Sequence, residues 1–108
     1  MLNYQKKLNQ KKMKNYIDNP QEVAYLKADE NYSLLMLANG KKILKSRPIK
    51  HYEASFLAQG WFRIHRSYMV NPIFVRQISE DRDHICLLDG TMLPISRRKR
   101  SKVIKWRR

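Results

Sequence analysis

Two Asx-Gly pairs, Asn39-Gly40 and Asp89-Gly90, constrain the fold of this chain more than any other feature. Each pair lies between short apolar runs, and this arrangement is the strongest short-range signal for a β-hairpin. The first pair predicts a hairpin that joins a strand at residues 32–37 to one at 41–45. The second predicts a hairpin between residues 84–88 and 91–95. In both places the sequence favours a two-residue type I′ turn, which needs a positive φ at both central residues.

The remaining strand signals are short. Residues 23–26 form an apolar run that ends in a turn signal at residues 29–31, and residues 32–37 are apolar on both phases, which predicts a strand covered on both faces. From residue 62 to 70, every second residue, starting at 62, is apolar except Arg66. Burying an arginine there is costly, so we predict a loop or strand end that projects Arg66 outward. Pro72 then precedes a predicted strand at residues 73–78.

Two segments predict helices. Ser46-Arg47-Pro48 is typical of a helix start with a serine cap, and Gly60 is a good stop. Apolar side chains at helical spacing predict its inward face: Ile49, Tyr52, Phe56 and Leu57. Near the C-terminus, Ser96 can cap a second helix, for which we predict the inward residues Val103, Ile104 and Trp106.

The positive charge is concentrated at the two ends of the chain. The 108 residues include 23 Lys and Arg against 9 Asp and Glu, a formal net charge of +14. Residues 1–16 contain five lysines and residues 97–108 contain eight cations, neither segment has an acid, and residues 17–96 are nearly balanced. We therefore expect a basic linker or tail at residues 1–20 and one domain at 21–108. A polyanion is the expected partner, although charge alone gives only sequence-blind binding.

Several classes of protein do not fit this sequence. The single cysteine, Cys86, excludes an internal disulfide and a multi-cysteine metal site, and we expect it to be a small buried hydrophobe. No run approaches the roughly 18 apolar residues of a membrane span, and the N-terminus lacks the apolar region of a signal peptide. We expect a cytoplasmic protein without metal or cofactor. The acids are scattered on turns, with one cluster at residues 80–83, so an enzyme is not expected.

The first turn of the predicted C-terminal helix contains only cations. Arg97-Arg98-Lys99-Arg100 stands where the helix dipole favours acids by about 0.3–1 kcal/mol each. This placement is explained if an anion such as a phosphate binds at this end of the helix, because the anion offsets the unfavourable position of the cations. The alternative is that they extend into solvent and the cost is tolerated.

Three blocks of the sequence, in order, resemble the LytTR DNA-binding domain of bacterial transcription regulators. They are V-A-Y-L-K-A…N-Y from residue 23, F-R-I-H-R-S-Y-M-V-N from residue 62, and D-G…L-P-I-S-R-R from residue 89. The resemblance covers residues 22–106. It implies a mostly β (α+β) fold of several short antiparallel sheets with one or two small helices. It also implies that loops at the edges of the sheets enter successive major grooves of double-stranded DNA.

The resemblance also implies which residues contact DNA. Base contacts carry over to one residue in each of three loops: Asn31, Arg66 and Arg97. These types suit the task, because Arg pairs with guanine and Asn with adenine through two hydrogen bonds. Contacts to the DNA backbone are expected from Lys45, Arg47, His65, Ser67, Arg98 and Lys99. For His65 a purely structural, hydrogen-bonded role is the alternative, and Asn71 is expected to be a turn residue.

The family resemblance favours a transcriptional regulator, an output domain without a receiver, which we expect to be either a stand-alone regulator or a piece of a longer one. It implies a monomer that pairs on direct repeats in DNA and a receiver or sensor domain, or a partner protein, that supplies the signal. A non-specific nucleic-acid or RNA-binding basic protein is the alternative, although it leaves the signature block unexplained. The operator sequence, the regulated genes, the sign of regulation and the input signal cannot be deduced from these residues.

Overall fold

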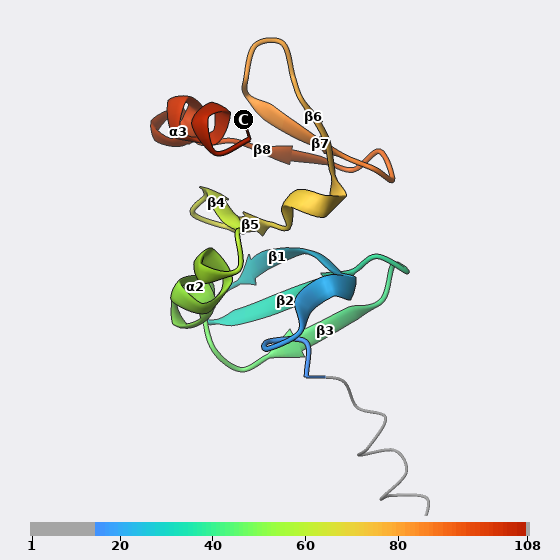
Figure 1. The fold of residues 1–108 in the computed structure, drawn as a ribbon. Coiled ribbons are helices and arrows are strands. Elements are labelled where there is room, and N and C mark those ends of the chain that lie inside the picture. The colour runs from blue at the N-terminus through green and yellow to red at the C-terminus, as the bar shows by residue number, and fades with distance from the viewer. Residues whose placement is uncertain (1–14, 108) are drawn as a thin grey trace, which may run out of the picture.

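A five-stranded antiparallel sheet forms the centre of the molecule (Figure 1). The computed structural model describes residues 15–107. The strand order is β3-β2-β1-β5-β4, so that β1 pairs on both edges. The strands of this sheet are β1 (Val23–Asp29), β2 (Tyr32–Leu37), β3 (Lys42–Lys45), β4 (Phe62–His65) and β5 (Tyr68–Val70).

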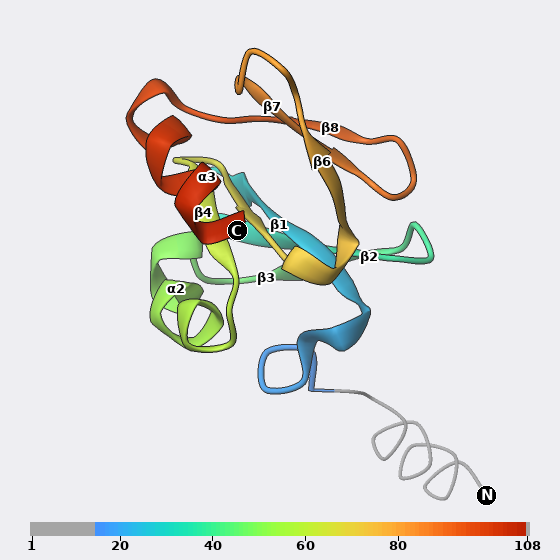
Figure 2. The same ribbon diagram turned by 45° about the horizontal axis from the view of Figure 1, so that its top comes forward.

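A smaller sheet of order β6-β7-β8 lies over one face of the first, and α3 lies beside it (Figure 2). In both views β4 lies between α2 and α3. The predicted fold class, mostly β with small helices, is confirmed. The remaining elements are η1 (Pro20–Glu22), α2 (Ile49–Ala58), η2 (Pro72–Phe74), β6 (Val75–Ile78), β7 (His84–Leu87), β8 (Met92–Pro94), η3 (Arg97–Lys99) and α3 (Arg100–Arg107). Among the described residues, none of the helices is long and apolar enough to cross a membrane.

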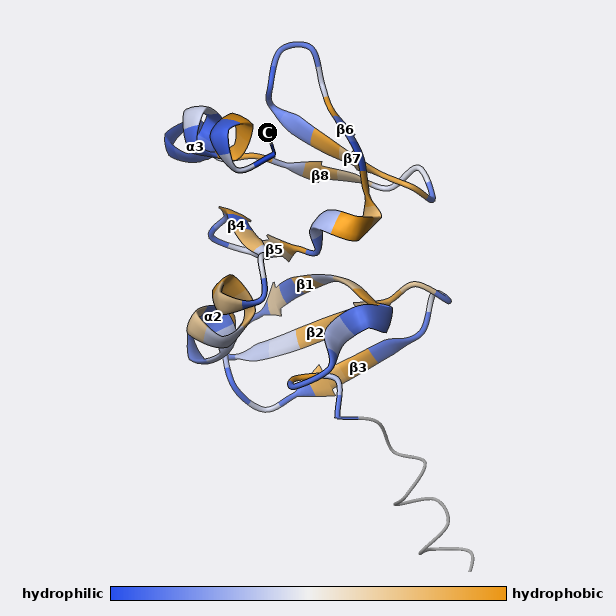
Figure 3. Ribbon diagram, viewed as in Figure 1, coloured by the Kyte–Doolittle hydropathy of each residue, from blue (hydrophilic) through white to orange (hydrophobic). Residues whose placement is uncertain are grey.

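The large sheet has an apolar core on each face. One core packs α2 against the sheet through residues such as Leu26, Leu35 and Phe56. The other packs the small sheet and α3 against the opposite face, with Ile64 and Val103 fully buried. Figure 3 shows apolar segments along the strands and a largely hydrophilic α3. Alternate side chains of one strand thus enter different cores, as the period of two requires.

Both hairpins form where predicted, but the turn type was wrong. In the first, only Gly40 has a positive φ, +89°, and Asn39 does not. The Gly40 amide donates to the Leu37 carbonyl (2.9 Å) and the Leu37 amide to the Lys41 carbonyl (2.8 Å). This is a three-residue loop, a type I turn closed by a glycine bulge. Gly90 repeats it, with φ +91° and equivalent bonds at Leu87 and Thr91.

The end of α2 is as predicted, and its start is not. Gly60 has φ +88°, its amide donates to the Leu57 carbonyl, and the Trp61 amide donates to the Phe56 carbonyl. These two bonds make a Schellman motif, and the Phe56 and Trp61 rings pack at 4.6 Å between centroids. At the start, Pro48 occupies the cap position and no side chain caps the helix, so the role predicted for Ser46 was wrong. Leu57, predicted to face inward, is exposed.

Other expectations need smaller corrections. Only one face of β2 is fully buried, and Leu34 and Met36 are half-buried on the other. The strand predicted at residues 73–78 begins as the short helix η2, so that Ile73 is exposed. Cys86 is half-buried. The C-terminal helix begins with η3, and Ser96 stands at its cap without a capping hydrogen bond from its side chain.

The burial predicted for the inward residues of the C-terminal helix, α3, is confirmed in part. Val103 is fully buried, whereas Ile104 and Trp106 are half-buried. Of the predicted basic linker or tail at residues 1–20, residues 1–14 lie outside the described part. Next to them, Tyr16 and Ile17 pack against the core beneath α2, and Pro20 is buried.

A buried amide, Asn71, ties the start of β1 to the end of β5. Its side chain is 5% exposed, and its Nδ2 donates to the carbonyl oxygens of Val23 (2.9 Å) and Pro20 (3.4 Å). Its Oδ1 accepts from the Ile73 amide (3.2 Å) and so caps η2. Asn71 is a turn residue, as expected, and it also links β1 to η2.

We expect Asn71→Ala to lower the free energy of unfolding by about 2–3 kcal/mol, because it leaves two buried carbonyls and one amide without this partner. Urea unfolding at neutral pH measures this change. Asn39→Ala, at an exposed turn, is the matched control and should cost about 0.5 kcal/mol or less. Equal costs for the two variants would contradict the role given to Asn71.

Candidate nucleic-acid interface

Four connections between elements meet at one end of the large sheet. They are the β1–β2 turn, the β3–α2 loop, the β4–β5 turn and the β8–η3 connection, on the left in Figure 1. Hydrogen bonds hold them together: Ala28 amide to Ser67 carbonyl (2.8 Å), Ser33 hydroxyl to Arg47 carbonyl (2.7 Å), and Ser96 amide to Ile64 carbonyl (2.9 Å). We call this end the basic edge. Both glycine hairpins lie at the opposite end.

The basic edge contains a cleft between α2, the β4–β5 turn and η3. Its volume is about 510 Å³, and its lining has five Lys and Arg side chains against one acid. Four residues predicted to contact DNA line it, His65, Arg66, Arg98 and Lys99, whereas Asn31, Lys45, Arg47, Ser67 and Arg97 do not. The sequence reasoning missed the other lining residues, Lys50, Glu53, Arg63 and Ser96.

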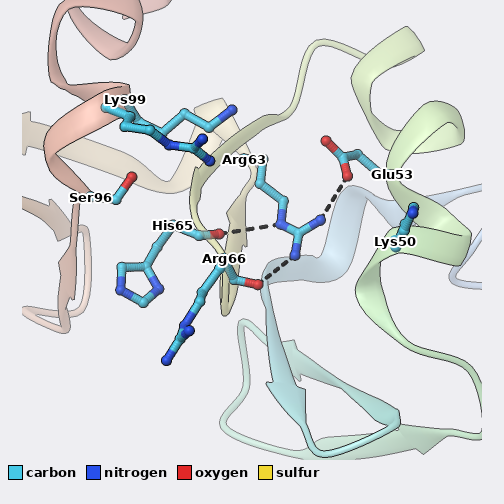
Figure 4. A pocket seen from close by; sticks show the side chains of 8 residues that line it. Lys50, Glu53, Arg63, His65, Arg66, Ser96 and Lys99 are labelled. Carbon is cyan, nitrogen blue, oxygen red and sulfur yellow. Dashed lines mark hydrogen bonds and ion pairs between the residues drawn. The ribbon is translucent and has the colours of Figure 1, made fainter.

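Arg66 extends from the tip of the β4–β5 turn. Its side chain is exposed, so the prediction that the chain turns outward there is confirmed. Arg63 holds this turn from the side of α2 (Figure 4). Its Nε donates to the carbonyl of His65 (3.2 Å), its Nη2 to the carbonyl of Arg66, and its Nη1 to Glu53 Oε1 (2.7 Å).

His65 shapes the same turn. The register of β4 against β5 shifts between Arg63 and His65, which is a β-bulge next to the turn. The Ser67 amide donates to His65 Nδ1 (3.0 Å), so the neutral ring carries its proton on Nε2. The predicted structural alternative for His65 is thus present, and Nε2–H is left for an outside acceptor.

The pKa of His65 is lowered from its usual value of 6.5. Partial burial of the ring is the largest cause, and the positive charges of Arg66 and then Arg63 add to it. The imidazole is therefore neutral at pH 7. This state fits the hydrogen bond from Ser67, because a protonated Nδ1 cannot accept it.

Packing of α3 against β4 fixes the position of η3 and of the cations that it carries, Arg97, Arg98 and Lys99. The Phe62 and Trp106 rings lie 5.3 Å apart between centroids, and Trp106 Nε1 donates to the Gly60 carbonyl (2.9 Å). Lys99 Nζ lies 5.7 Å from the centre of the Phe62 ring, within reach of a cation–π interaction. Arg97 and Arg98 are exposed just before α3.

Asn31 lies next to acidic residues, whereas the cleft is lined mainly by cations. It follows Glu30, whose φ of +55° forms the tight turn after the last β1–β2 pair, Asp29 with Tyr32. Asn31 is exposed, and the two acids before it are exposed as well. The acids at residues 80–83 belong to the β6–β7 connection. The described residues contain no group of three His, Cys, Asp or Glu side chains placed to hold a metal ion.

Comparison with known proteins identifies the family. The family described as LytTr DNA-binding domain matches residues 13–107. The chain belongs to the LytTR DNA-binding domain family. A solved structure of a LytTr DNA-binding domain from Bacillus cereus is similar in fold, with a TM-score of 0.69 and 20% identity, over 79% of this chain and 80% of that one. No curated protein matches.

Membership of the LytTR family assigns a general role to the chain. The family is one of DNA-binding domains of transcription regulators and is not an enzyme family. DNA is therefore a partner of this chain, and regulation of transcription is the process in which it acts. The cleft of the basic edge, lined by five Lys and Arg side chains, is a cationic surface for such a partner.

The lowered pKa of His65 predicts how stability depends on pH. Because the unfolded chain binds this proton near pH 6.5 and the folded domain at lower pH, the stabilisation is complete above about pH 6.5 and is lost as the pH falls toward the folded pKa. Between pH 7.5 and 5, the wild type should lose more unfolding free energy than His65→Asn, which cannot titrate. Urea unfolding of both proteins measures this; an equal or larger loss for His65→Asn contradicts it.

Proposed function

We propose that this domain, residues 21–108, binds double-stranded DNA sequence-specifically and regulates transcription. The observation that carries the proposal is the basic edge, where the loops with Asn31, Arg66 and Arg97 share one end of a rigid sheet. The two exposed arginines suit bidentate pairs with guanine, and Asn31 suits adenine. In this proposal the loops enter successive major grooves, and no helix lies along a groove.

Contacts to phosphates would position the protein without reading sequence. We assign them to Lys45, Arg47, His65, Ser67, Arg98 and Lys99. Support comes from the cleft, whose lining combines cations of η3 with Arg66 of the β4–β5 turn. His65 offers its Nε2–H as a neutral donor. The cations that precede α3 would then have an anion near them, which offsets their unfavourable position.

We further propose that two copies bind direct repeats, each as a monomer that pairs only on DNA. A receiver or sensor, on this or another chain, would supply the signal, and the action would take place in the cytoplasm. Non-specific binding to nucleic acid or RNA is the competing function, because the net charge of +14 favours any polyanion. Sequence preference distinguishes the two.

A binding selection from random duplex DNA at about 150 mM salt tests the proposal first, because sequence-blind attraction is weakened at that salt. Enrichment of a short motif, repeated at about one helical turn, supports sequence-specific binding to direct repeats. Binding without enrichment contradicts specificity. Repeating the selection with RNA then tests the competing function.

Arg66→Ala and Arg97→Ala should each reduce the preference for the selected duplex over a scrambled one by about 1–3 kcal/mol. Fluorescence anisotropy with labelled duplexes gives both dissociation constants. Arg76→Ala is the matched control, because Arg76 is exposed on β6 away from the basic edge. If the control and the two variants change the preference equally, the assignment of base contacts is wrong.

Lys99→Ala should weaken binding to all duplexes alike and make the slope of log K against log salt shallower by about 1, as expected for one lost phosphate contact. Anisotropy titrations at several salt concentrations measure the slope. Lys41→Ala, in the hairpin at the opposite end, should leave the slope nearly unchanged. A change in sequence preference on removing Lys99 would instead make it a base contact.

A further inference from the structure

Arg63 differs from Arg66, which lines the same cleft, because its guanidinium donates hydrogen bonds to the β4–β5 turn and to α2. The side chain is 18% exposed, and its guanidinium contacts two carbonyls of the β4–β5 turn and one carboxylate of α2. Arg66, three residues later, is exposed, and no hydrogen bond of its side chain to the described residues is recorded. The two arginines of the same signature block are therefore in opposite states, one bound internally and one free.

The geometry of the Arg63 contacts suits a clamp. A guanidinium presents its donors in a rigid planar fork, so its contacts fix the carbonyls of His65 and Arg66 relative to one another. The third contact, to Glu53 at 2.7 Å, attaches the fork to the middle of α2. The α2 helix is in turn held by the Phe56–Trp61 packing. The turn that presents Arg66 is thus braced against the core of the molecule.

We infer that Arg63 and Glu53 are positioning residues that set the direction of Arg66 for base recognition. This inference rests on the proposed function, in which Arg66 contacts a base. A bidentate contact needs its donors placed within about 0.5 Å of the productive geometry, and a two-residue turn alone does not provide that. The Arg63–Glu53 pair holds the backbone of the turn from behind without adding free charge, because each partner neutralises the other.

Two variants separate positioning from electrostatics. Arg63→Lys keeps the net charge but replaces the fork with a single ammonium group, which cannot maintain the same contacts. Glu53→Ala removes the third contact and raises the net charge by one, so simple attraction predicts tighter binding to every duplex. Positioning predicts the opposite for discrimination: the ratio of dissociation constants for scrambled and selected duplexes falls about three- to tenfold in both variants.

Matched controls change the same residue types elsewhere. The controls are Arg76→Lys and Glu80→Ala. Arg76 is exposed on β6, and Glu80 is exposed in the β6–β7 connection. Neither should change the ratio. Far-UV circular dichroism and urea unfolding confirm that each variant is folded under the binding conditions, and Glu53→Ala keeps the test available if Arg63→Lys fails to fold.

A double-mutant cycle provides the readout that a merely structural role would not change. In an Arg66→Ala background, Arg63→Lys and Glu53→Ala should lower the ratio no further, because the residue that they position is gone. Additive losses, or no loss in the single variants while Arg66→Ala alone lowers the ratio, overturn this inference and leave the proposed function standing. If Arg66→Ala itself leaves the ratio unchanged, the proposed role of Arg66 fails and the inference fails with it.

Discussion

The pairing of β1 with β5 is the interaction on which the rest of this structure depends. It joins residues 23–29 to residues 68–70 and places β1 in the middle of the sheet. The Ala28–Ser67 hydrogen bond closes the pairing at one end, and Asn71 closes it at the other through Ala24 and Val23. Since β1 and β4 end where β2 and β5 begin, and β3 ends on the same side, this register brings the β1–β2 turn, the β4–β5 turn and the β3–α2 loop to one edge.

The basic edge follows from that register together with charge. A sheet with a core on both faces holds its strand ends rigidly, so cations on the connecting loops keep their places although they repel one another. The structure neutralises one of them, Arg63, by pairing it with Glu53, and leaves Arg66, Arg97 and Arg98 exposed. A surface of this kind gains most from a polyanion, because the repulsion among the exposed cations is relieved when phosphates lie between them.

The sequence predicted what depends on local chemistry. Glycine at positions 40, 60 and 90 marked two hairpins and a helix end, because each needs a positive φ that other residues rarely adopt. The turn type was missed, since an Asx-Gly pair suits both a type I′ turn and a type I turn with a bulge. The helix cap predicted at Ser46 was wrong because Pro48, with an extended backbone, takes that position. The signature block identified the exposed arginine of the β4–β5 turn.

The parts of the site that escaped prediction depend on tertiary contacts. Glu53 and Arg63 belong to different elements, and a helical pattern gives no sign that one of its acids reaches the next strand. Lys50 likewise reads as an ordinary exposed helix residue until the fold places it on the wall of the cleft. Only the F-R-x-H-R spacing hints that Arg63 and Arg66 could have different tasks. Where charges gather in space is set by register and packing, which a one-dimensional pattern does not contain.

The central claim is that DNA binds at the basic edge. An NMR titration of the isotope-labelled protein with a duplex, followed through backbone amides, tests it most directly. The account predicts that the largest shifts fall at Asn31, Arg66, Ser67 and residues 96–99, whereas the amides of Gly40 and Gly90 at the opposite end stay nearly unchanged. Shifts concentrated at the glycine hairpins, or spread evenly over the surface, would contradict it.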